Sequence, residues 1–128
     1  MGSSPSILEN IRILVVEDNA DTRFLIARFL AEQGAQVFAA KNAFEGLRLV
    51  RETRPNVVVS DINMPGRNGF EFLVDIRTLG KNSGGSVPVI AMTAYAIDDR
   101  VIVDAGFQRA LRKPFAPDQL LATIHLVL

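Results

Sequence analysis

The sequence contains no cysteine and only one histidine, His125, among its 128 residues. Disulfide bonds, thiolate metal sites and cysteine nucleophiles are therefore excluded, as are metal centres built from several histidines. Charge of one sign is not in excess either, because 14 lysines and arginines balance 14 aspartates and glutamates. Nucleic-acid-binding domains usually carry a basic excess, so we expect no nucleic-acid partner.

Long apolar runs are also missing. No stretch of about 18 apolar residues occurs, so we expect no membrane-spanning segment. The opening residues, MGSSPS, lack the charged and apolar regions of a signal peptide, and we expect a cytoplasmic protein. We interpret residues 1–10 as a flexible N-terminal arm or the remnant of a tag. Residues 11–128 are enough for one domain with its own core.

Short apolar runs alternate with helical patterns along this domain. The runs predict five strands, at residues 11–16, 36–40, 56–60, 87–92 and 108–111. The patterns predict five helices, at residues 20–33, 43–54, around Phe72, at 98–105 and from Pro117 onward. Strands alternating with helices indicate a parallel sheet covered on both faces, and the chain is too short for a (βα)₈ barrel. The predicted buried face of the first helix consists of Leu25, Ile26, Phe29 and Leu30.

The helix at 98–105 contains three consecutive apolar residues, Val101, Ile102 and Val103. Three neighbours span about 200° of a helix, so one or two of them must point away from the core. Exposed apolar residues often mark surfaces that bind partners. We therefore predict a self-association or partner interface around these three residues.

Polar residues follow several strands, at the edge where open parallel sheets bind their ligands. Glu17 and Asp18 follow the first strand, Asp61 the third, Thr93 the fourth and Lys113 the fifth. Adjacent strands lie about 4.8 Å apart, so these side chains can converge on one small site. Three crowded carboxylates repel one another and need a cation. Oxygen donors without histidine or cysteine suit Mg²⁺.

Such a site suits phosphoryl transfer. Lys113 supplies a positive charge and Thr93 a hydrogen-bond donor, which together stabilise the equatorial oxygens of a phosphoryl group. A carboxylate can itself be the nucleophile and form an aspartyl phosphate. Asp61 is the candidate, because it lies on the central strand beside the predicted metal site.

Four motifs occur in order at the strand ends. They are Val15–Asn19 (VVEDN), Asp61–Gly69 (DINMPGRNG), Met92–Ala94 (MTA) and Lys113–Phe115 (KPF). With these motifs, the chain resembles the receiver domain of two-component response regulators over nearly its whole length. The resemblance implies a flavodoxin-like, doubly wound (βα)₅ fold whose five-stranded parallel sheet has the order 2-1-3-4-5.

The resemblance also implies how the acidic residues act. Asp61 would accept a phosphoryl group from the phosphohistidine of a histidine kinase or a histidine phosphotransfer protein. Asp18, Asp61 and the backbone carbonyl of Asn63 would bind Mg²⁺ (or Mn²⁺), and Glu17 would act mostly through a metal-bound water. The domain would catalyse only its own phosphorylation and dephosphorylation, and would not be an enzyme for an external substrate.

The remaining motif residues would act on the phosphoryl group. The resemblance implies that Thr93, Lys113 and the Ala94 N–H hold its oxygens, with a cis bond between Lys113 and Pro114. Tyr95, like Asn63, would tune the lifetime of the acyl phosphate. The fourth helix, fifth strand and fifth helix would form the output face, where we expect a homodimer or partner contact.

One position departs from the family pattern. Receivers usually carry Tyr or Phe three residues before the motif lysine, where this sequence has Ala110. The aromatic half of the usual switch is therefore missing, and we hypothesise that Tyr95 takes over part of its role. A receiver-like binding module that works without phosphorylation stays open as an alternative. A phosphatase with an aspartyl nucleophile is disfavoured, because Asn63 stands where it needs a second acid.

Overall fold

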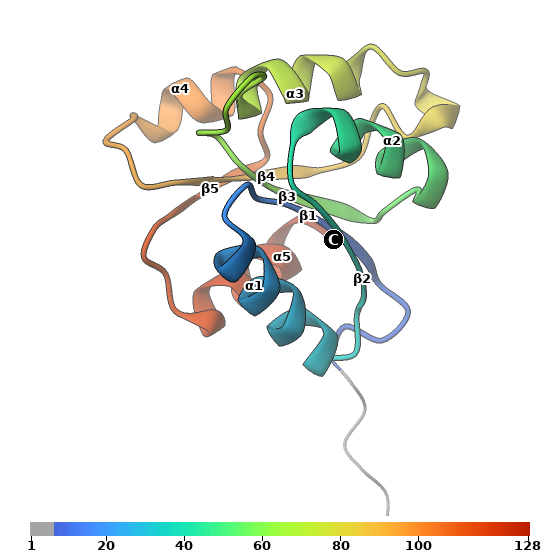
Figure 1. Ribbon diagram of the computed structural model, residues 1–128, viewed down its shortest axis with the longest axis vertical. Helices are drawn as coiled ribbons and strands as arrows, with labels where there is room; N and C mark the ends of the chain where they lie inside the picture. The colour runs from blue at the N-terminus through green and yellow to red at the C-terminus, as the bar shows by residue number, and fades with distance from the viewer. Residues whose placement is uncertain (1–6) are drawn as a thin grey trace, which may run out of the picture.

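The computed structural model describes residues 7–128 (Figure 1). Five parallel strands form one sheet in the predicted order, β2-β1-β3-β4-β5. The strands are β1 (Arg12–Val16), β2 (Gln36–Ala40), β3 (Val57–Asp61), β4 (Val89–Thr93) and β5 (Arg109–Arg112). The helices are α1 (Ala20–Glu32), α2 (Ala43–Thr53), α3 (Gly69–Arg77), α4 (Asp99–Asp104) and α5 (Pro117–Val127), with a short 3₁₀ turn at Lys81–Ser83. None of the helices between residues 7 and 128 has the length and apolarity to cross a membrane.

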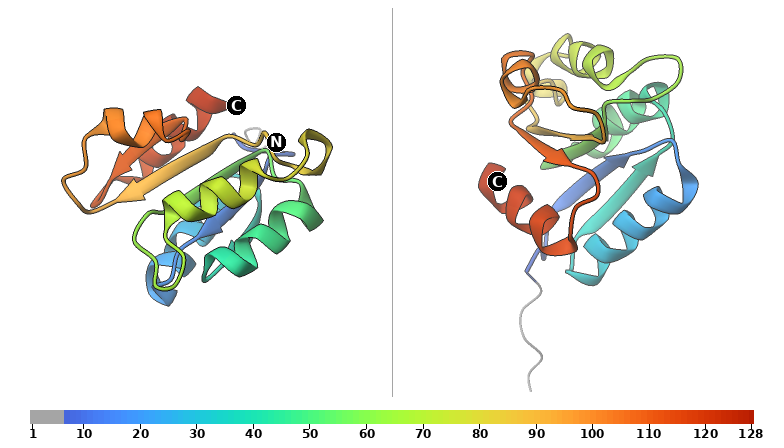
Figure 2. Two further views of the ribbon diagram at one scale, coloured as in Figure 1. Left: turned by 90° about the horizontal axis from the view of Figure 1, so that it is seen from above. Right: turned by 90° about the vertical axis from the view of Figure 1, so that its left-hand side faces the viewer.

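The sheet lies between two layers of helices, as Figures 1 and 2 show. Helices α1 and α5 cover one face, and α2, α3 and α4 cover the other. Strand β1 shows why both faces are buried: Leu14 and Val16 pack into one core cluster, and Ile13 and Val15 into the other. Side chains alternate across a strand, so a fully apolar strand needs a layer on each side. The α/β fold class is therefore confirmed.

The face of α1 differs in one position from the prediction. Ile26 and Leu30 are buried as expected, but Leu25 is 64% exposed. The reason is an open groove between α1 and α5, which Leu25 lines instead of entering the core. In α4 two of the three consecutive apolar residues point away from the core, as expected, because Ile102 is buried while Val101 and Val103 are 54% and 49% exposed.

The expected N-terminal arm, residues 1–10, is described by the structure only from residue 7 onward. Residues 1–6 of the expected N-terminal arm lie outside the described residues. Residues 7–10 form a turn against the domain, in which Leu8 is fully buried. The Leu8 N–H donates to the carbonyl of Gln33 at 2.8 Å, so this turn is anchored at the end of α1.

Candidate functional site

Three carboxylates meet at the carboxyl ends of two adjacent central strands. Glu17 directly follows β1, and Asp61 is the last residue of β3. Both are buried, with 1% and 5% of their surface exposed, while Asp18 is exposed. One carboxylate oxygen from each residue lies within 4.8 Å of the others. The sequence interpretation expected these three side chains together, and the fold brings them there.

Lys113 completes the cluster from the end of β5. Its Nζ lies 2.6 Å from Glu17 Oε1 and 3.2 Å from Asp61 Oδ2. The bond from Lys113 to Pro114 is cis, as the resemblance implies. Burial disfavours the charge of the ammonium, but the hydrogen bond to Glu17 and the charge of Asp61 outweigh burial. The pKa of Lys113 therefore lies above its ordinary value, and the lysine stays charged.

Backbone amides orient the two buried carboxylates. The Asn19 N–H donates to Glu17 Oε2 at 3.1 Å, and the Asn63 N–H donates to Asp61 Oδ1 at 3.1 Å. Asn19 also caps α1, since its side chain accepts the Thr22 N–H. The positive end of the α1 dipole thus lies beside the acidic pair, where it stabilises negative charge.

Gly69 allows the loop after Asp61 to fold tightly. Its N–H donates to the Ile62 carbonyl at 2.7 Å, where α3 begins. A Cβ at this position would lie 2.6 Å from the Asp61 carbonyl oxygen and 2.7 Å from Ile62 Cα, closer than real Cβ contacts. Glycine is therefore required for α3 to start this close to the strand end. The same tight turn carries Asn63 at the exposed edge of the site.

The predicted phosphoryl-binding residues lie at the end of the next strand. Thr93 is the last residue of β4 and is fully buried, while Ala94 and Tyr95 are exposed. The Tyr95 N–H donates to Thr93 Oγ1 at 3.1 Å. Ala110 on β5 is half-buried against the core and, as the sequence already indicated, offers no aromatic ring.

Two arginines near the site were missed by the sequence interpretation. Arg23 Nη1 donates to the Glu17 carbonyl at 2.8 Å, which holds the loop carrying the acidic pair. Arg112 Nη1 donates to the Tyr95 carbonyl at 2.7 Å. Weak signals for both were present, since Arg23 lies five residues after Asp18 and Arg112 adjoins Lys113. Neither spacing reveals that the arginines bind backbone carbonyls.

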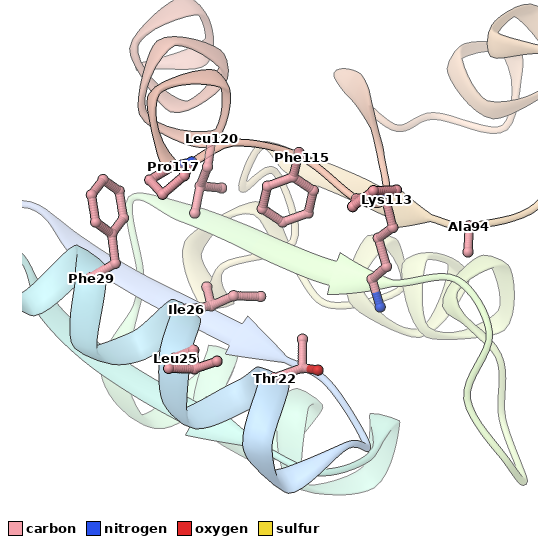
Figure 3. A pocket seen from close by; sticks show the side chains of 10 residues that line it. Thr22, Leu25, Ile26, Phe29, Ala94, Lys113, Phe115, Pro117 and Leu120 are labelled. Carbon is pink, nitrogen blue, oxygen red and sulfur yellow. The ribbon is translucent and has the colours of Figure 1, made fainter.

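An apolar groove of about 590 Å³ opens beside Lys113 (Figure 3). It runs between α1 and the start of α5, and Figure 3 draws the side chains that line it. The lining residues are Thr22, Leu25, Ile26, Phe29, Ala94, Lys113, Pro114, Phe115, Pro117 and Leu120. The groove therefore connects an apolar surface directly with the charged cluster.

Comparison with known proteins agrees with this arrangement. A family model of the response regulator receiver domain matches residues 13–125. The chain belongs to this family. As a receiver domain, it is 40% identical over 120 residues to an uncharacterised 14.6 kDa protein from the sodA1 3′ region of Leptolyngbya boryana, covering 92% of this chain and 90% of that protein. It is 36% identical over 120 residues to the response regulator MprA of Mycobacterium sp. strain KMS, covering 92% of this chain but only 50% of MprA.

Solved receiver structures share the fold. The chemotaxis protein CheY4 of Vibrio cholerae superposes with a TM-score of 0.84 at 29% identity, over 92% of this chain and 98% of that one. The receiver domain of the sensor histidine kinase PA1611 of Pseudomonas aeruginosa PAO1 superposes with a TM-score of 0.81 at 28% identity, over 91% and 93% of the two chains. That structure holds a magnesium ion in its active-site cleft.

The acidic cluster of this receiver domain can hold a metal ion. Its donors are the carboxylate oxygens of Glu17, Asp18 and Asp61, with no nitrogen or sulfur ligand among them. Hard oxygen donors with at least one exposed member fit Mg²⁺, which keeps several waters and needs few protein ligands. The donor chemistry therefore fits the ion found in the PA1611 receiver.

Proposed function

We propose that Asp61 accepts a phosphoryl group from the phosphohistidine of a histidine kinase or a histidine phosphotransfer protein. One observation carries this proposal: the Asp61 carboxylate lies 3.2 Å from the Lys113 ammonium and has an oxygen within 4.8 Å of carboxylate oxygens of Glu17 and Asp18. A buried carboxylate with a nearby cation and further metal-binding oxygens is equipped to be a nucleophile toward a phosphoryl group. The domain would be a phosphorylation-controlled switch and would catalyse only its own phosphorylation and dephosphorylation.

The proposed transfer exchanges one bond to phosphorus for another. An Asp61 carboxylate oxygen attacks the phosphorus in line with the histidine nitrogen, and the new P–O bond forms as the P–N bond breaks. The imidazole leaves with the electron pair of that bond. Dephosphorylation is the attack of water on the same phosphorus, which returns the Asp61 carboxylate and releases inorganic phosphate.

The metal ligands would be Asp18, Asp61 and the backbone carbonyl of Asn63, with Glu17 acting through a bound water. A bound Mg²⁺ supplies charge that offsets the negative charge of the phosphoryl oxygens. The residues themselves set up this site, since the Asn63 N–H orients Asp61 and Lys113 offsets part of the carboxylate repulsion. Mn²⁺, which accepts the same oxygen donors, would substitute.

The phosphoryl oxygens would be held by groups from the ends of β4 and β5. Thr93 supplies a hydroxyl, Ala94 a backbone N–H and Lys113 an ammonium. Because Lys113 already lies 3.2 Å from Asp61, it needs little movement to reach an oxygen of the new phosphoryl group. The exposed Ala94 is small, which leaves the approach to the site open. Asn63 and Tyr95 are exposed two residues after the ends of β3 and β4, where they would affect the access of water and hence the phosphate lifetime.

The groove between α1 and α5 is the docking site that we propose for the phosphodonor. It is lined mainly by apolar side chains and ends at Lys113, next to Asp61 (Figure 3). An amphipathic helix whose apolar face enters such a groove would bring a histidine on its rim to the site. The exposed Leu25 and the aromatic rings of Phe29 and Phe115 would be its main contacts.

The output surface that we propose is the face formed by α4, β5 and α5. Val101 and Val103 are exposed on α4, so this face can bind a partner or a second copy of the domain through apolar contacts. Phosphorylation would change the affinity of this face.

The test is the intact mass of the protein after incubation with acetyl phosphate. We expect one added phosphoryl group in the presence of Mg²⁺ and none with a chelator, because carboxylate repulsion is then not offset. Asp61→Asn is expected to abolish the adduct, while Asp75→Asn, a carboxylate on α3, keeps it. If wild type forms no adduct and also fails to bind beryllofluoride with Mg²⁺, the binding module that works without phosphorylation replaces this proposal.

A further inference from the structure

Arg112 joins the end of β5 to the loop between β4 and α4. In the parallel pairing of these strands it lies opposite Thr93. Its guanidinium donates to the Tyr95 carbonyl at 2.7 Å, and also to the Ile97 carbonyl and the Asp99 carboxylate. One side chain therefore binds the loop at two points and the first residue of α4 at a third.

The other end of the same loop is attached to the phosphorylation site. Tyr95 donates its N–H to Thr93 Oγ1 at 3.1 Å, while its carbonyl accepts from Arg112. Tyr95 is thus held on one side by the threonine that would contact the phosphoryl group and on the other by β5. If Thr93 moves toward a phosphoryl group on Asp61, the Tyr95 N–H is pulled toward the site while Arg112 holds its carbonyl back.

The loop has space for this movement. It borders an open hollow of about 550 Å³, lined by Ala94, Tyr95, Ala96, Ile97, Asp98 and Arg112. The ion pair between Arg112 and Asp99 is also accessible to water, since 41% and 69% of the two side chains are exposed. Water can replace exposed hydrogen bonds of this kind at little cost, so the contacts are reversible.

We propose that Arg112 restrains the β4–α4 loop and α4 in the unphosphorylated arrangement, and that phosphorylation of Asp61 releases this restraint. The inference rests on the proposed function of Asp61 and adds the route by which the signal leaves the site. Ala110 has no ring to move, so a route through that position is closed. Arg112 offers another, because it binds both the switch loop and the helix that exposes Val101 and Val103.

The shape of the Arg112 guanidinium matters for this role as much as its positive charge does. A guanidinium carries five N–H donors in a planar fork, so it can bind two carbonyls and a carboxylate at once. A lysine ammonium has the same charge but is a compact group on a flexible stem. Arg112→Lys therefore keeps the positive charge at this position but removes the planar fork of N–H donors. Arg109→Lys, an exposed arginine on the same strand, is the matched control.

Tyr95 itself provides the signal to measure. It is the only tyrosine, and the sequence has no tryptophan, so intrinsic fluorescence reports directly on the loop. Hydrogen–deuterium exchange over residues 94–104 reports on the loop and α4 together. Both are measured with and without Mg²⁺ and beryllofluoride, a mimic of the phosphoryl group.

In wild type and Arg109→Lys we expect beryllofluoride to raise exchange over residues 94–104 and to change the Tyr95 fluorescence. In Arg112→Lys we expect exchange to be high already without beryllofluoride, with a much smaller further change. Because the restraint no longer opposes the switched arrangement, we also expect Arg112→Lys to bind beryllofluoride several-fold more tightly than wild type.

Three results separate the two proposals. Failure of wild type to bind beryllofluoride with Mg²⁺ would contradict the proposed function itself. Normal binding with equal exchange changes in wild type and Arg112→Lys would overturn the role of Arg112 alone. Should Arg112→Lys not fold, Asp99→Ala removes one of the three contacts at the exposed surface. It is expected to shift exchange in the same direction by a smaller amount, and an unchanged profile would overturn the inference.

Discussion

Lys113 lies closer to Glu17 than to Asp61, with Nζ 2.6 Å from Glu17 Oε1 and 3.2 Å from Asp61 Oδ2. Glu17 and Lys113 are 96 residues apart in the chain, so this ion pair joins the first strand end to the last. The lysine therefore neutralises part of the acidic cluster before any phosphoryl group arrives. This arrangement stabilises a site that would otherwise hold mutually repelling carboxylates.

Replacing Lys113 tests how much it stabilises the folded domain. Lys113→Met leaves the buried carboxylate of Glu17 without its partner, so we expect the free energy of unfolding in a chelator to fall by about 3 kcal/mol. Adding Mg²⁺ should recover more stability in Lys113→Met than in wild type, because the ion then offsets the carboxylate charge. Urea unfolding with and without Mg²⁺ measures both effects.

Lys41→Met is the control for this change. Lys41 is exposed and lies 3.9 Å from Glu45 on the surface of α2, so its loss should alter the free energy of unfolding by at most about 0.5 kcal/mol. Equal destabilisation by the two substitutions would mean that Lys113 forms an ordinary surface ion pair.

Gly69 should tolerate no side chain. In Gly69→Ala the new methyl group meets the backbone of Asp61 and Ile62, so we expect destabilisation of about 1–3 kcal/mol and slower phosphorylation by acetyl phosphate. Gly80→Ala is the matched change, because a Cβ there meets nothing within 4 Å and the φ of −61° suits any residue. It should leave stability unchanged or raise it by about 0.5 kcal/mol. Similar losses in both variants would contradict the close packing described for α3.

If the groove between α1 and α5 binds a protein phosphodonor, changing its wall should slow phosphotransfer from that protein but not from acetyl phosphate. Leu25→Glu places a charge on its apolar wall, so we expect phosphotransfer from a phosphorylated histidine phosphotransfer protein to slow by about tenfold, given the 1.5–3 kcal/mol that burying a leucine contributes. Phosphorylation by acetyl phosphate, which needs no docking, should keep its rate. Phe44→Glu, an exposed aromatic on α2, should change neither. Equal slowing with both phosphodonors would mean that Leu25→Glu disturbs the phosphorylation site at Asp61 and not docking in the groove.

Self-association through α4 is tested by light scattering. We expect the mass of wild type to rise with beryllofluoride and Mg²⁺, and Val101→Glu to remain monomeric because it places a charge on the apolar contact. Val74→Glu, which alters an exposed valine on α3, should behave as wild type. Monomeric masses for all three proteins would exclude self-association and leave a different partner for this face.

The fold was predictable because its elements have strong local signals. The β-branched run before Glu17 and the alternation of strands with helices predict a doubly wound sheet, and the observed strands deviate from the predicted ranges by at most two residues. The strand order came from the resemblance, since alternation alone does not specify which strands are neighbours. Leu25 was assigned wrongly because helical periodicity cannot tell a core from an open groove.

The acidic cluster was predictable for a similar reason. Parallel strands bring their carboxyl ends to one edge, so Glu17, Asp61 and Lys113 could be expected together without coordinates. The contacts of Arg23 and Arg112 could not, because both donate mainly to backbone carbonyls and carbonyls leave no signature in a sequence. The same applies to the preference of Lys113 for Glu17, which depends on distances of a few tenths of an ångström.

The central claim is that Asp61 carries the phosphoryl group, and chemical mapping tests it most directly. After incubation with acetyl phosphate and Mg²⁺, borohydride reduces an aspartyl phosphate to homoserine, which peptide mass spectrometry can locate. We predict homoserine at position 61, and none when Mg²⁺ is removed by a chelator. A phosphorylated protein whose modification maps to Asp18, Asp75 or any other residue, with Asp61 intact, would contradict the account.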